Sequence, residues 1–127
     1  MATSVVMLST FGTREDALRI GRVLVEERLA ACVNLLGDVT SIYRWKDAVQ
    51  EDPEVLCAFK TTRARLPALK ARLVALHPYE VPEMIALPVA AGHAPYLAWL
   101  AASVSPKAAR GARTRARPSP RRRPPAG

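Results

Sequence analysis

Residues 31 to 61 are the most informative stretch of this chain for its fold. They read A-C-V-N-L-L-G-D-V-T-S-I-Y-R-W-K-D-A-V-Q-E-D-P-E-V-L-C-A-F-K-T. Two runs with strand character, 31–45 and 49–61, flank Lys46-Asp47, which suits the tight turn of a hairpin. At about 3.3 Å per residue the first strand would extend roughly 50 Å, whereas a domain of about 100 residues has a radius of gyration near 13 Å. We therefore expect the hairpin to overhang its own core.

The overhanging half of the hairpin carries Val39, Ile42, Tyr43 and Trp45, and Gly37-Asp38 could place a bulge that bends the strand before them. Apolar side chains there need a covering surface, and a partner subunit would supply one. With Lys46-Asp47 as the turn and regular pairing, Cys32 would lie opposite Thr61 and Cys57 opposite Leu36. The two thiols would then be four positions, or about 13 Å, apart, which is too far for a disulfide.

The flanking segments complete the fold. Residues 4–10 form a β-branched, apolar run, and Thr13 offers an N-cap for a helical stripe that continues to about Leu29. Leucines at helical spacing follow from Leu66, and that helix ends at His77-Pro78. A fourth strand over 83–89 and a last short helix opened by Pro95 follow. The order β-α-β-β-α-β plus a helix predicts an α+β, ferredoxin-like fold.

The charge divides the 127-residue chain in two. Of the net charge of +8, residues 1–106 contribute nothing, with eleven Lys and Arg against eleven Asp and Glu, and residues 107–127 contribute all eight. This Arg- and Pro-rich stretch lacks large apolar residues, which predicts one folded domain over 1–105 and a disordered basic tail over 106–127. Such a tail would bind polyanions weakly and non-specifically, whereas the neutral body carries no nucleic-acid-binding motif.

Neither a membrane span nor a secretory signal is apparent, so we expect a cytoplasmic protein without membrane contact. Cys32 and Cys57 sit inside apolar runs, which favours core packing over redox or metal roles. The chain also lacks a nucleophile motif, a glycine-rich phosphate loop and a cofactor fingerprint. An acid-base pair of His77 and Glu80 can be imagined, but we predict no catalytic residues and no enzyme.

The candidate metal site lies in L-H-P-Y-E-V-P-E, residues 76–83. His77 offers an imidazole suited to copper, zinc or nickel, and Glu80 and Glu83 offer harder oxygen ligands. The alternative is structural, since a histidine at a helix C-terminus meets the macrodipole favourably, and prolines at 78 and 82 end a helix and lead into a strand. The sequence is compatible with both interpretations.

A second candidate is a ligand cleft between subunits, formed by Arg44, Trp45, Lys60 and Tyr79 beside Glu80. The two cationic side chains would attract an anion or pair with Glu80. The alternative is a structural network that holds the oligomer together, and the aromatic residues are more typical of interface and core packing than of a ligand cage.

Five motifs carry a family resemblance: E-R-L-A-A-C-V-N at 27–34, S-I-Y-R-W-K at 41–46, K-T-T at 60–62, H-P-Y-E-V-P-E at 77–83 and Y-L-A-W-L at 96–100. In this order and spacing they resemble the CutA-type divalent-cation tolerance proteins, over residues 4 to about 104. The resemblance implies a homotrimer with hairpins paired between subunits, a role in tolerance of divalent metals including copper, and no established catalytic activity. Ser9 stands where some members have a cysteine associated with copper, and it is a poor substitute ligand.

The sequence thus predicts a homotrimeric metal-tolerance protein that binds copper or a related divalent cation, with none required for folding. The alternative is a signalling trimer of the PII type that binds a small anion in the cleft between subunits, a hypothesis that rests on analogy of fold.

Overall fold

A computed structural model describes residues 3–106 of the chain. Its elements follow the predicted order, β-α-β-β-α-β with a terminal helix, and form an α+β fold. The predicted basic tail and the domain boundary before it fall at or beyond the last described residue. The elements are β1 (Ser4–Phe11), α1 (Arg14–Glu26), β2 (Cys32–Trp45), β3 (Ala48–Thr62), α2 (Leu66–Leu76), β4 (Ile85–Pro88) and α3 (Ala94–Ser103).

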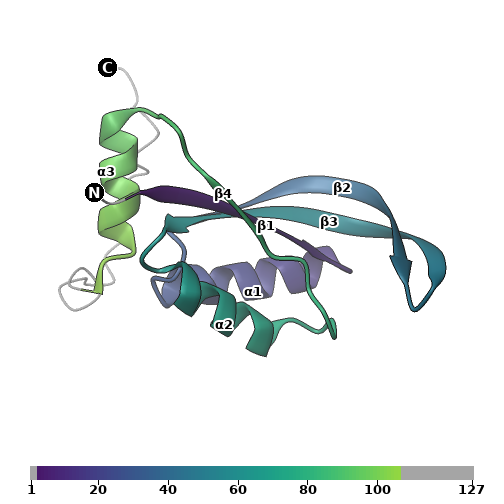
Figure 1. The fold of residues 1–127 in the computed structure, drawn as a ribbon. Coiled ribbons are helices and arrows are strands. Elements are labelled where there is room, and N and C mark those ends of the chain that lie inside the picture. Colours follow the sequence, from purple (N-terminus) through teal and green to yellow (C-terminus); the bar gives the residue numbers. More distant parts are fainter. Residues whose placement is uncertain (1–2, 107–127) are drawn as a thin grey trace, which may run out of the picture.

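The four strands form one antiparallel sheet in the order β2-β3-β1-β4. Both α1 and α2 cover the same face of this sheet, while α3 stands across the end where β1 begins (Figure 1). The long strands β2 and β3 continue past the helices and bend toward the side of the sheet on which the helices lie (Figure 1). The predicted overhang of the hairpin is therefore present in the folded chain.

Helix α1 begins as its sequence predicts. The side chain of Thr13 accepts a hydrogen bond from the Asp16 amide at 3.0 Å, and acidic residues occupy the first turn, where the helix dipole favours them. The helix was expected to reach Leu29 but ends at Glu26, because Arg28 takes a left-handed backbone conformation with φ 60°.

The hydrophobic core lies between the two helices and the sheet. Alternate residues of β1 and β3 pack there against one apolar stripe from each helix. This is the arrangement expected from a repeat of two residues in a strand and about 3.6 residues in a helix. A second, smaller cluster packs α3 against the end of the sheet, where Leu100 and Val104 meet Ala31. The largest fully buried side chains of the main core are Met7, Phe11, Ile20, Leu24, Phe59, Leu69 and Leu73.

The hairpin turn lies at the predicted dipeptide. Lys46 and Asp47 have φ of 52° and 66°, so two residues with positive φ join Trp45 to Ala48, as in a type I′ turn. A bulge interrupts the pairing between Leu35 and Gly37, and Gly37 has φ 138°, a conformation that suits glycine. The predicted bulge is therefore present, with Leu36 as its extra residue.

This bulge changes the predicted register of the cysteines. Cys32 pairs with Lys60 rather than Thr61, and Cys57 pairs with Leu35 rather than Leu36, so the regular pairing assumed for the whole hairpin was wrong. The two cysteines are now three positions apart and lie on opposite faces of the sheet. Both are free thiols, with Cys57 buried in the core and Cys32 half-buried on the other face.

On the face of the sheet opposite the two helices, β1 and β4 present an apolar area. Val6 and Leu8 point to it, because the neighbouring Met7 is buried in the core, and they pair with Leu87 and Ile85 of β4. Ile85 and Leu87 remain about half exposed, at 51% and 48%. Strand β4 is shorter than the predicted span of 83–89, so residues 83 and 84 belong to the loop that precedes it. Within residues 3–106 no helix is long and apolar enough to cross a membrane.

Candidate ligand cleft

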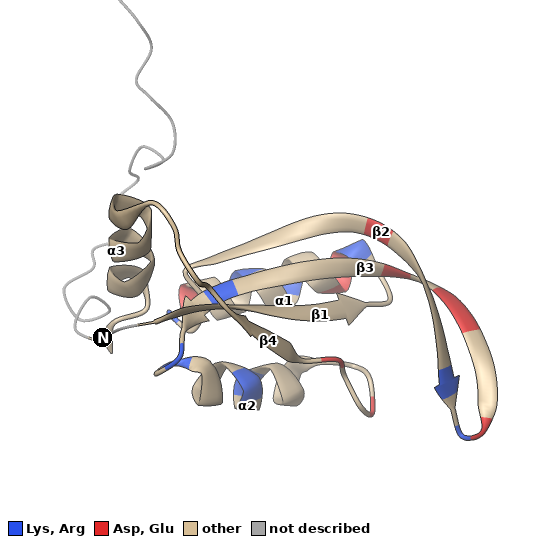
Figure 2. Cartoon of the chain, turned by 45° about the horizontal axis from the view of Figure 1, so that its top comes forward, with Lys and Arg blue, Asp and Glu red and all other residues tan. Residues whose placement is uncertain are grey.

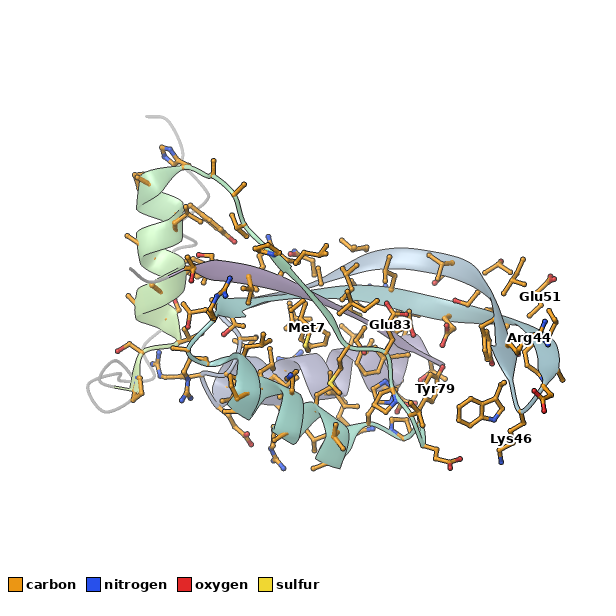
Figure 3. The ribbon with its side chains drawn as sticks, viewed as in Figure 1. Met7, Arg44, Lys46, Glu51, Tyr79 and Glu83 are labelled. Carbon is orange, nitrogen blue, oxygen red and sulfur yellow. The ribbon has the colours of Figure 1, made fainter. Side chains whose placement is uncertain are left out.

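A cleft of about 940 Å³ lies under the overhanging half of the hairpin. The hairpin forms one wall, the end of β1 forms the floor near Gly12, and the loop of residues 77–84 after α2 forms the opposite wall. Figure 3 shows Tyr79 and Glu83 on the loop side, with Arg44 and Lys46 toward the tip of the hairpin. Four of the lining side chains are carboxylates, Asp52, Glu54, Glu80 and Glu83, and three are aromatic, Tyr43, Trp45 and Tyr79.

Tyr79 connects the two walls of the cleft. Its hydroxyl donates a hydrogen bond of 2.7 Å to Oε2 of Glu54 on β3. Burial raises the pKa of Tyr79 well above its usual value, and the hydrogen bond to the Glu54 carboxylate raises it further. The phenol therefore keeps its proton and remains a donor.

A second tyrosine holds a second carboxylate of the same wall. The Tyr43 hydroxyl donates to Oδ2 of Asp52, and this bond raises the pKa of Tyr43. Sequence reasoning missed Asp52 and Glu54 as cleft residues. The signal was their i, i+2 spacing in E-D-P-E, which places both side chains on one face of a strand. Figure 2 shows acidic residues, coloured red, along this part of β3.

His77 is the C-cap of α2 and is only 6% exposed. Its Nδ1 accepts a hydrogen bond from the Tyr79 amide at 3.1 Å, so Nε2 carries the proton and donates to the Thr10 carbonyl at 2.8 Å. The ring also stacks on Phe11, with centroids 4.6 Å apart and planes at 15°. Burial lowers the pKa of His77, opposed by the bond to Thr10 and by the charges of Asp16 and Glu54.

These contacts bear directly on the predicted metal site. Both ring nitrogens of His77 are engaged by the protein, which leaves this imidazole no free lone pair for a metal ion. The structure does bring Glu80 and Glu83 to one cleft, Glu80 exposed and Glu83 half-buried. Among the residues described, no three side chains of His, Cys, Asp or Glu gather closely enough to hold a metal ion. A single chain therefore brings only part of the predicted ligand set together.

The four residues predicted to form a ligand cleft do not lie at one site within a single chain. Trp45 and Tyr79 line the cleft, whereas the Arg44 guanidinium lies 3.5 Å from the Asp47 carbonyl at the turn. Lys60 lies at the other end of β3, where its Nζ is 3.4 Å from the Tyr96 hydroxyl and 5.6 Å from the centre of that ring. Within one chain Lys60 and Tyr79 do not share a site.

Ser9 lies away from the cleft. It is fully buried in the face of β1 that packs on the helices, opposite Cys57, and its Oγ has no hydrogen-bond partner within residues 3–106. Burial raises the pKa of the neighbouring Cys57 thiol to about 11, which keeps it protonated at neutral pH. Neither side chain reaches the carboxylates under the hairpin.

Comparison with known proteins places this geometry in a family. The family model described as CutA1 divalent ion tolerance protein matches residues 5–103. The chain belongs to this family. The predicted basic tail, residues 106–127, lies outside the matched range.

Relatives from distant organisms share this body. The divalent-cation tolerance protein CutA of Thermus thermophilus is 55% identical over 95 residues, covering 75% of this chain and 92% of that protein. Protein CutA of mouse is 54% identical over 84 residues, covering 66% of this chain but only 48% of its own length. The chain thus spans about half of this mammalian relative.

A solved structure of the divalent cation tolerance protein from Thermus thermophilus superposes with a TM-score of 0.78 at 51% identity, covering 80% of this chain and 99% of that one. The predicted family and the ferredoxin-like α+β fold are therefore confirmed.

Proposed function

We propose that this chain forms a homotrimer in the cytoplasm and binds divalent cations, copper among them, without catalysing a reaction. The observation that carries the proposal is its membership, over residues 5–103, of a family described by divalent ion tolerance. The role we assign is the binding of the ion itself, in the cleft under the hairpin.

The charges of the cleft support a cation as the ligand. Four carboxylates line it. The basic side chains of Arg44 and Lys46, which neighbour the lining residue Trp45 in sequence, lie toward the hairpin tip (Figure 3). Carboxylate oxygens bind divalent cations, and Cu(II) binds most strongly among the first-row divalent ions at a given oxygen or nitrogen site. The same acidic lining gives less support to the alternative, a PII-type signalling trimer that binds a small anion.

The trimer would complete the ligand set. One chain gathers too few ligands for a metal ion within the described residues, and its hairpin extends beyond its own core. The half-exposed apolar side chains of Ile85 and Leu87 are suited to burial against a second subunit. We propose that neighbouring hairpins pair and that Glu80 and Glu83 face ligands from an adjacent chain.

Calorimetric titration of the full chain tests this function. We expect Cu(II) to bind near neutral pH, and nucleotides and small organic acids to give no heat of binding. The double variant Glu80→Gln/Glu83→Gln should bind Cu(II) about tenfold more weakly or worse, because two anionic oxygen donors are lost. The matched control is Glu15→Gln/Glu26→Gln, which removes the same charge from exposed positions on α1. Equal affinity in the two double variants would contradict the proposed site.

A further inference from the structure

The loop that carries Glu80 and Glu83 has no regular secondary structure between the end of α2 and the start of β4. Side chains that bind an ion must be held in position, because a mobile loop loses conformational entropy on coordination. Two hydrogen bonds fix the first part of this loop to the sheet: His77 to the Thr10 carbonyl, and Tyr79 to Glu54.

The His77 ring joins these two attachments. Its Nε2 donates to the backbone carbonyl of Thr10, near the end of β1, and its Nδ1 accepts from the backbone amide of Tyr79. The ring also packs against two aromatic rings, with its centroid 4.6 Å from that of Phe11 and 4.6 Å from that of Tyr79. The imidazole therefore fixes the start of the loop relative to β1, and Tyr79 carries that position across to β3.

We propose that His77 is the positioning residue of the cleft: its neutral imidazole anchors the loop to β1, so that Glu80 and Glu83 face the hairpin, and it does not itself coordinate the cation. This inference rests on the proposed function for its binding readout. It assigns a separate task to each half of H-P-Y-E-V-P-E, the histidine and tyrosine holding the backbone and the two glutamates meeting the ligand.

Two near-isosteric variants of the full chain separate anchoring from coordination. The amide nitrogen of His77→Gln can take the place of Nε2 and donate to Thr10, whereas His77→Asn is too short for Thr10 but can accept from the Tyr79 amide as in an Asx-turn. Calorimetry with Cu(II) gives the affinity of each variant. A crystal structure of each, without metal, shows whether Tyr79 still reaches Glu54. The matched control is His93→Gln, at the other histidine, which precedes α3.

We expect His77→Gln to keep Cu(II) affinity within about threefold of the unaltered chain and to keep the Tyr79–Glu54 hydrogen bond, while His77→Asn loses about tenfold or more and loses that bond. Equal, severe losses in both variants would mean that the imidazole is a ligand, and would overturn the inference. Unchanged affinity in both, or rescue by Asn alone, would also overturn it. If the unaltered chain binds no cation, the proposed function fails, and the two metal-free structures still decide whether His77 anchors the loop.

Discussion

The phenol of Tyr79 and the carboxylate of Glu54, 25 residues apart in the sequence, share a hydrogen bond of 2.7 Å. This bond joins the loop after α2 to the overhanging half of β3, so the position of the hairpin and the shape of the cleft depend on each other.

Tyr79→Phe removes the donor and leaves the ring. We expect the free energy of unfolding to fall by about 1 kcal/mol, which is less than is usual for a hydrogen bond to a charged group, because the pair is partly exposed and solvent weakens the interaction. Tyr43→Phe is the control, since its bond to Asp52 is exposed, and its effect should be smaller. Chemical denaturation of both variants measures the difference. A larger loss in the Tyr43 variant would contradict the coupling.

His77 should make stability depend on pH in a defined direction. Burial lowers its pKa in the folded chain, so the unfolded chain binds a proton more readily. Its contribution to stability is present above the unperturbed pKa of about 6.5 and is lost as the pH falls through the lowered folded value. We expect the unaltered chain to lose stability between pH about 7 and about 5, and His77→Gln to lose less over the same range. Parallel pH profiles would exclude a buried neutral imidazole.

Gly37→Ala should destabilise the chain through the backbone alone. A Cβ there meets no atom within 4 Å, but φ is 138°, a conformation that costs other residues about 1–3 kcal/mol. Gly12→Ala is the control, because its φ is not in that region and its nearest contact, the Tyr79 hydroxyl, is at 3.4 Å. Thermal unfolding compares the two. Equal effects would mean that the strain at the bulge is relieved by local rearrangement.

The open face of the sheet should set the oligomeric state. We expect the unaltered chain to sediment as a trimer at low and high salt, since apolar contacts and paired strands are little screened. Leu87→Glu places a charge on this face and should shift the mass toward smaller species. Leu18→Glu, at a comparably exposed position on α1, should leave the mass unchanged. A monomer in the unaltered chain would refute the assembly.

The basic tail lies outside the described residues and stays a prediction from composition. The full chain should bind DNA or RNA weakly, with an affinity that falls on the order of a thousandfold between about 50 mM and about 200 mM salt if most of its eight charges meet phosphates. A chain ending at Ser105 should not bind. Gel-shift titration over a salt series measures this, and retained binding by the shorter chain would place the polyanion surface on the body.

Much of the fold could be predicted because its signals are local. Thr13 and Asp16 form the expected cap, and Lys46-Asp47 is the turn of the hairpin. The cysteine register could not be predicted, because a bulge shifts every pair beyond it and no local pattern names Leu36 as the extra residue.

The site was less accessible to sequence reasoning. The structure brings Trp45, Tyr79, Glu80 and Glu83 to one cleft, and their roles as ligands stay predictions. Glu54 was missed because its contact with Tyr79 depends on the curvature of the hairpin, which no alternation of residues reveals.

Strand β2 is the outer strand of the sheet along all 14 of its residues. An edge of that length offers a row of backbone donors and acceptors to any extended peptide that approaches it. A single chain outside the proposed trimer would therefore be at risk of uncontrolled strand addition and aggregation. Pairing of the hairpins between subunits, as we propose, would cover this edge as well as shape the cleft. Assembly would then limit aggregation even before any ion is bound.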